Sequence, residues 1–213
     1  PRFVYFFCIF LTLYHLIARV GLATDLQWHL DVGRDRMLTP PHVMILGGFP
    51  ICVVLSLYYL VVNTRDERSG KQLSGVRILG FIAPGSVWMI LLGMLSIGVG
   101  GIYDDYWHAQ FGIDTTVITP PHMLTLFGGI LAEFASLLLL RDLMNHDSQN
   151  EFKGKKAMAA IMLWALLFHG CFSFLNFVDP RAGAVPVFGF NVMLHLFFGL
   201  PDGSSIAFFE APE

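Results

Sequence analysis

The segment TPPHMLTLFGGILAEFASLLLL, Thr119 to Leu140, decides the fold class of this chain. It supplies the roughly 20 mostly apolar positions that an α-helix needs to cross the hydrocarbon of a membrane. Within it, Glu133 is the single Asp, Glu, Lys or Arg residue. Four similar runs and one shorter run lie at about 3–23, 40–62, 76–101, 157–178 and 185–200.

The composition supports the same class. The 213 residues are 55% hydrophobic and 14% charged, whereas soluble domains carry roughly 25% charged residues. A disordered chain, a nucleic-acid binder (the net charge is −3) and a disulfide-stapled domain (there are three cysteines) are excluded. We therefore predict an all-α, polytopic membrane bundle of five to six helices, with 1–213 as a single transmembrane domain. Because the sequence begins at Pro1, it leaves open whether a further segment or a processed leader precedes that residue.

The basic residues predict an orientation, because Lys and Arg collect at cytoplasmic helix ends. One set of helix ends carries nine of them: Arg2, Arg65, Arg68, Lys71, Arg77, Arg141, Lys153, Lys155 and Lys156. The opposite set carries four: Arg19, Arg34, Arg36 and Arg181. Loops 62–75 and 141–156 are therefore expected in the cytoplasm, and loops 24–38 and 102–118 on the other side.

Both outer loops lead into the next span through the same pattern, which indicates an internal repeat of about 24–62 and 103–141. Asp25, Trp28, His29, Gly33 and Asp35 recur 79 residues later as Asp104, Trp107, His108, Gly112 and Asp114. The TPPH sequence 39–42 recurs 80 residues later as 119–122. We interpret this as a duplicated helix-pair unit.

Each copy offers two histidines and one carboxylate. Asp25 and His29, like Asp104 and His108, stand at i and i+4, on one face of a helical turn. Thr39 and Thr119 are good N-cap residues, which places His42 and His122 in the first turn of their spans. There the positive end of the helix dipole disfavours imidazolium, so a ring nitrogen stays available for a metal.

A set of two His and one carboxylate suits zinc, non-haem iron or copper, and residue types alone do not choose among them. The competing interpretation is that each histidine caps or packs a helix end. The repetition in a membrane protein favours the metal, because ionisable groups are costly there. Further candidates, which would orient the histidines, are Arg34, Asp35 and Asp114.

Glu133 is an intramembrane carboxylate eleven residues after His122. It is either functional, in a proton path or partner contact, or a neutral hydrogen-bonded residue. For His15, His169 and His195 we favour packing or interhelical hydrogen bonds over a haem held by two of them.

The first copy resembles the C subunit of the copper membrane monooxygenases, the family of particulate methane and ammonia monooxygenases. The resemblance rests on D-x-x-W-H at 25–29, R-D at 34–35, T-P-x-H at 39–42 and F-P at 49–50. It covers about 24–62 well and 102–130 by spacing only. It implies copper ligands Asp25, His29 and His42 at one site and Asp104, His108 and His122 at a second, where the family has an amide side chain in place of Asp104.

The resemblance further implies a subunit that supports O₂-dependent hydroxylation of methane, ammonia or a short alkane. It implies A- and B-type partner subunits in a trimer of heterotrimers and a bacterial or archaeal inner or intracytoplasmic membrane, with the metal loops on the non-cytoplasmic side. The alternative is a non-catalytic metal-binding or accessory membrane subunit of a larger complex.

Overall fold

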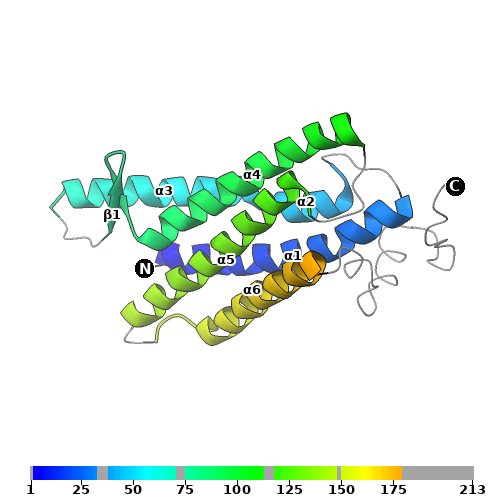
Figure 1. Ribbon diagram of the computed structural model, residues 1–213. Coiled ribbons are helices and arrows are strands. Elements are labelled where there is room, and N and C mark those ends of the chain that lie inside the picture. Colours follow the sequence, from blue (N-terminus) through cyan, green and yellow to red (C-terminus); the bar gives the residue numbers. More distant parts are fainter. Residues whose placement is uncertain (1, 33–37, 71–74, 113–117, 148–149, 179–213) are drawn as a thin grey trace, which may run out of the picture.

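The computed structural model describes residues 2–32, 38–70, 75–112, 118–147 and 150–178, without the side chains of 26, 27, 29–32 and 175–178. It is mostly helical (Figure 1). The helices are α1 (Arg2–Val32), α2 (Pro40–Leu46), α3 (Phe49–Arg68), α4 (Gly85–Phe111), α5 (Pro120–His146) and α6 (Lys155–Val178). Within these residues five segments are long and apolar enough to cross a membrane, with α2 and α3 together forming one of them. The predicted sixth span, 185–200, lies outside the described residues.

A small β-hairpin corrects the all-α prediction and the predicted start of the third span. Residues 76–83 form β1 (Val76–Ile78) and β2 (Phe81–Ala83), antiparallel with Val76 opposite Ala83. The cause is the Leu79-Gly80 turn, since both residues have positive φ, at 50° and 83°, as a tight hairpin turn requires. The span therefore begins only after Pro84.

Two helices continue into segments that were expected to be loops. α1 runs on to Val32 and α4 to Phe111, past the predicted ends at about 23 and 101. The extra turns place Asp25, Asp104 and His108 on helical backbone, in keeping with their i, i+4 spacing. The candidate ligands therefore stand on regular elements.

The second span is broken where α1 packs against it. The break falls at Gly47-Gly48, between α2 and α3, and the Tyr14 hydroxyl donates to the carbonyl of Ile45 at 2.9 Å. A Cβ on Gly48 would overlap the Tyr14 ring. The glycine therefore leaves room for the aromatic ring at the break.

Close packing of α4 against α5 positions the two helices that carry the second ligand set. A Cβ added to Gly93 would come within 2.6 Å of the Gly128 carbonyl oxygen, and one added to Gly128 within 2.7 Å of the Gly93 carbonyl oxygen. Small residues let membrane helices approach closely in this way.

Helix directions bring the two ligand-bearing regions to one end of the bundle. The C-terminal ends of α1 and α4 and the N-terminal ends of α2 and α5 lie together, opposite the β-hairpin and the α5–α6 turn (Figure 1). At that opposite turn Asp147 accepts hydrogen bonds from the backbone N–H groups of Glu151 and Phe152 and from Lys155. The bond from Lys155 is the main reason that the pKa of Asp147 lies below its usual value.

Candidate metal centre

Asp104 and His108 stand one turn apart in the last turns of α4. Their side chains approach each other, with His108 Nε2 at 3.4 Å from Asp104 Oδ2. Asp104 is only 7% exposed. A carboxylate so far removed from water is costly unless a cation or hydrogen-bond donors compensate for it.

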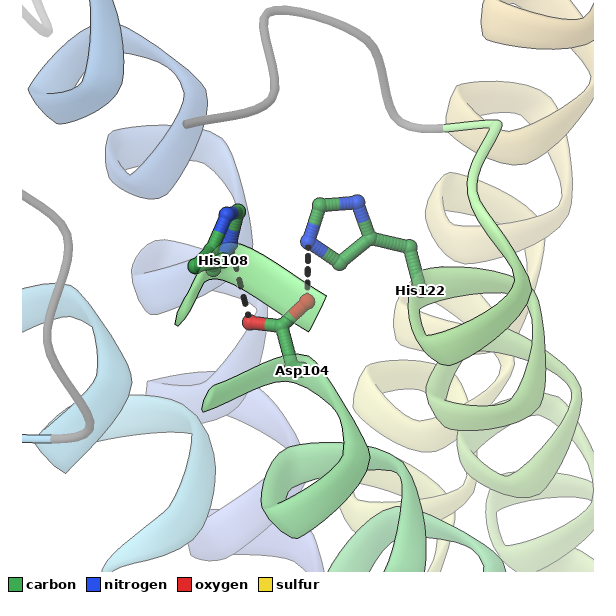
Figure 2. Close-up of side chains that lie close together, drawn as sticks. All are labelled: Asp104, His108 and His122. Atoms are coloured by element: carbon green, nitrogen blue, oxygen red, sulfur yellow. Dashed lines mark ion pairs between the residues drawn. The ribbon is translucent and has the colours of Figure 1, made fainter. Parts of the chain in front are cut away.

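His122 completes the set from the neighbouring helix. It lies in the first turn of α5, and its Nε2 is 3.1 Å from Asp104 Oδ1 (Figure 2). One ligand atom from each of Asp104, His108 and His122 lies within 4.8 Å of the others. Among the described residues, this is the one group of three or more His, Cys, Asp or Glu side chains with the geometry to hold a metal ion.

Gly112 orients the His108 ring. It ends α4 with a positive φ of 85°, and its carbonyl oxygen lies 2.9 Å from His108 Nδ1. A carbonyl only accepts, so Nδ1 carries the hydrogen, and a neutral ring presents its Nε2 lone pair to the Asp104 carboxylate. Two lone pairs facing each other repel unless a cation, either a proton on Nε2 or a metal ion, lies between them. Metal-binding histidines are typically held by such a bond from the other ring nitrogen to a carbonyl.

The predicted capping role of Thr39 and Thr119 is only partly right. Both residues occupy the N-cap position with extended backbone, ahead of a proline in the first turn. Neither hydroxyl makes the side-chain capping hydrogen bond. Prolines at the first two helical positions account for part of this, because they leave only the N–H of the third residue, His42 or His122, for a capping side chain to bond. The placement of His42 and His122 in the first turn is as predicted.

The first ligand set is described in part. Asp25 Oδ1 and His42 Nε2 lie 3.3 Å apart, which matches the Asp104–His122 pair of the second set. His42 also lies within electrostatic range of the Asp104 carboxylate, so the two sets are neighbours. The His29 side chain and the predicted supporting residues Arg34, Asp35 and Asp114 lie outside the described part of the chain.

Deeper in the bundle, the structure joins residues for which the sequence indicated no partner. Glu133 on α5 is fully buried and faces Arg19 Nε at 2.9 Å and His169 Nδ1 at 3.0 Å. His15 Nδ1 lies 3.7 Å from the same carboxylate. His169 thus makes an interhelical hydrogen bond to Glu133, and His15 makes one to Ser136 Oγ at 3.0 Å, which is the bonding that we favoured over haem ligation. His195 lies outside the described residues.

Arg19 corrects the count of basic residues at helix ends. It was assigned to the outer set, but it is 6% exposed and lies inside α1, paired with Glu133. The sequence signal for this pair is one arginine within the apolar span of α1 and one glutamate within the apolar span of α5. Two opposite charges that must both be buried are best buried together.

The fold and the site together define a helical bundle of membrane-protein character with an Asp/His/His cluster at one end. Comparison with protein-family models, with curated proteins and with solved structures finds no match in any of the three. The function is therefore argued from the site.

Proposed function

We propose that this chain is an integral-membrane subunit of a copper-dependent monooxygenase complex, of the C-subunit type. The observation that carries the proposal is the Asp104–His108–His122 cluster, whose ligand spacing is that of the second copper site implied by the family resemblance. The arrangement of His108 supports it, since Gly112 holds one ring nitrogen and leaves the other facing the carboxylate.

The residues have distinct roles in this proposal. Asp104, His108 and His122 hold the metal, and Asp25, His29 and His42 form the neighbouring site of a duplicated unit. Bound copper would supply O₂ activation for hydroxylation of methane, ammonia or a short alkane, with electrons from a quinol or another donor. The protein positions the site at helix ends, where Leu126, one turn after His122, packs with Phe172 in an apolar cluster.

The assembly and location follow from the same resemblance. A- and B-type subunits would complete a trimer of heterotrimers in a bacterial or archaeal membrane. The metal end would lie on the non-cytoplasmic side, because the opposite end carries most of the Lys and Arg.

Metal analysis of the purified chain tests the proposal. We expect copper to bind in preference to zinc and iron, and His108→Ala or His122→Ala to weaken binding by about tenfold or more. His146→Ala is the matched control, because His146 is exposed and lies at the far end of α5. Unchanged copper affinity in both site variants would refute the metal centre.

Copurification from the native membrane then separates the enzyme subunit from the accessory alternative. We expect A- and B-type chains to copurify and the complex to oxidise methane or ammonia in an O₂-dependent reaction that His122→Ala abolishes. A copper-binding chain whose complex retains full activity in that variant would be an accessory subunit instead.

A further inference from the structure

The buried polar side chains around Glu133 contain more than an ion pair. This Glu133 cluster consists of His15 and Arg19 from α1, Glu133 and Ser136 from α5, and His169 from α6. The Arg19 guanidinium already balances the Glu133 charge. Two imidazoles are therefore present beyond what charge neutrality needs.

Hydrogen bonding defines which nitrogen of His15 carries hydrogen. Ser136 Oγ donates to the carbonyl of Ala132 at 2.7 Å, so it accepts from His15 Nε2 at 3.0 Å. A neutral His15 then turns the lone pair of Nδ1 toward Glu133 Oε1. This nitrogen has the chemistry to bind a proton beside the carboxylate.

His169 has the complementary arrangement. The carboxylate accepts, so His169 Nδ1 carries the hydrogen that bonds Glu133 Oε2 at 3.0 Å. Its Nε2 is buried and has no hydrogen-bond partner among the described residues. A nitrogen that can accept a proton, Nε2 of His169, therefore lies on the side of the imidazole opposite the bond to Glu133.

The His169 ring extends toward the end of the bundle that carries the metal centre. It lies against Gly129, where any side chain would overlap it and which is one turn nearer His122 than Glu133 is. Ser173, one turn further along α6 toward the same end, has a buried hydroxyl that also finds no partner in the described part of the chain. Buried polar atoms of this kind are where proteins bind internal water.

We propose that the Glu133 cluster is a proton-exchanging site inside the membrane bundle, reached through His169 from the end that carries Asp104. An arriving proton binds Nε2 of His169, the N–H bond at Nδ1 breaks, and its proton moves to Oε2 of Glu133. The protonated carboxyl passes this proton on to Nδ1 of His15, 3.7 Å from Oε1, and a different proton returns through Glu133 to Nδ1 of His169 as the one on Nε2 leaves. One proton thus enters for each that leaves, the Nδ1 hydrogen is replaced, and no electron moves. Arg19 keeps the resting cluster neutral.

The groups that face Glu133 support a local exchange. From α1 these are His15 and Arg19, and from α6 His169. Tyr14 of α1 also lies within electrostatic range, with its hydroxyl donating to the carbonyl of Ile45. α4 contributes Gly93, Ser96 and Ile97 to its close contact with α5, and none of these titrates. Exchange at the cluster is therefore governed by the imidazoles and the carboxylate themselves.

Hydrogen–deuterium exchange of the His169 ring proton tests this in the metal-free protein in lipid. By solid-state NMR, we expect the Nδ1 proton to exchange about tenfold or more faster than the backbone amides of Ala132 and Ala135. Exchange as slow as that of these amides would show a static ion pair and overturn the proposal. The readout needs no copper, so it stands or falls separately from the proposed function.

Variants locate the two steps. Glu133→Gln keeps a hydrogen-bond acceptor but removes the proton acceptor, so it should slow the exchange; unchanged exchange would overturn the role of Glu133. Should that variant not fold, Glu133→Asp retains the charge that pairs with Arg19 and should slow exchange by lengthening the contact to His169.

Ser173→Ala should slow entry of the proton, and an unchanged exchange rate would exclude the path from that end. His146→Asn, which removes an exposed histidine, should change nothing.

Discussion

At the scale of single residues, the candidate metal centre depends on where backbone geometry directs each imidazole. The Gly112 carbonyl orients the His108 ring, and the position of His122 in the first turn of α5 orients the His122 ring. Asp104 lies one turn before His108 on α4, and its two carboxylate oxygens face the Nε2 atoms of His108 and His122. The chemistry of the site therefore depends on a glycine that binds no metal itself.

Gly112→Ala should weaken metal binding although it leaves every candidate ligand in place. The backbone at Gly112, with φ 85° and ψ −173°, is strained for any L side chain by about 1–3 kcal/mol. Relief of that strain would move the carbonyl that holds His108. Copper affinity measured by competition should fall by about tenfold.

Gly101→Ala is the matched control on the same helix. Its Cβ would meet Leu46 carbon atoms at 3.6 and 3.7 Å, an ordinary contact. We expect copper affinity to stay unchanged in this variant. Equal losses in Gly112→Ala and Gly101→Ala would show that the effect comes from α4 as a whole and not from the His108 contact.

At the scale of elements, the contact between α4 and α5 decides whether Asp104 and His122 can meet at all. The two residues are on different helices, and the glycines at 93 and 128 set how closely the helices pack. Gly129 has the same role for His169, because the absence of a side chain there lets the His169 ring lie against the α5 backbone. Small residues thus position both polar clusters of the bundle.

Gly128→Ala should destabilise the bundle because its methyl group meets backbone. The Cβ would lie 2.7 Å from the Gly93 carbonyl oxygen and 3.1 Å from the Ile97 nitrogen, neither of which can rotate away. We expect a loss of about 1–3 kcal/mol, measured as a lower Tm in detergent.

Gly170→Ala provides the comparison for that substitution. Gly170 lies in α6, where an added Cβ meets nothing within 4 Å among the described residues. The Tm should stay equal or rise, since alanine favours helix over glycine by up to about 1 kcal/mol. A Gly128→Ala protein as stable as Gly170→Ala would refute close α4–α5 packing.

At the scale of the whole molecule, antiparallel helices gather the candidate ligands at one end and most of the Lys and Arg residues at the other (Figure 1). Leu38 and Phe111 are exposed at the ligand end, and Ser69 and Glu151 at the opposite end. These positions are suited to a test of membrane topology.

Single cysteines introduced at 38, 111, 69 and 151, with the exposed Cys171 replaced by serine, should react from opposite sides. An impermeant maleimide applied outside intact cells should label 38 and 111 and spare 69 and 151, because the latter lie near most of the basic residues. Labelling of 69 and 111 from the same side would contradict the arrangement of the spans.

Much of the molecule was predictable because it depends on local sequence. The length and apolarity of a span are properties of one continuous segment, so the five spans among the described residues follow from composition alone. The Asp104–His108 pair follows from the i, i+4 geometry of a helix. The Leu79-Gly80 hairpin was missed because its apolar residues merged with the span that follows.

Only the tertiary structure decided which residues of different helices meet. The sequence determined the spans and the spacing of the candidate ligands. It did not predict that Arg19, His15 and His169 surround Glu133. The physical reason is that membrane helices are apolar on every side, so no period of hydrophobicity distinguishes the buried face from the lipid-facing one. Here the buried faces were decided by close helix packing and by the need of each buried charge for a partner.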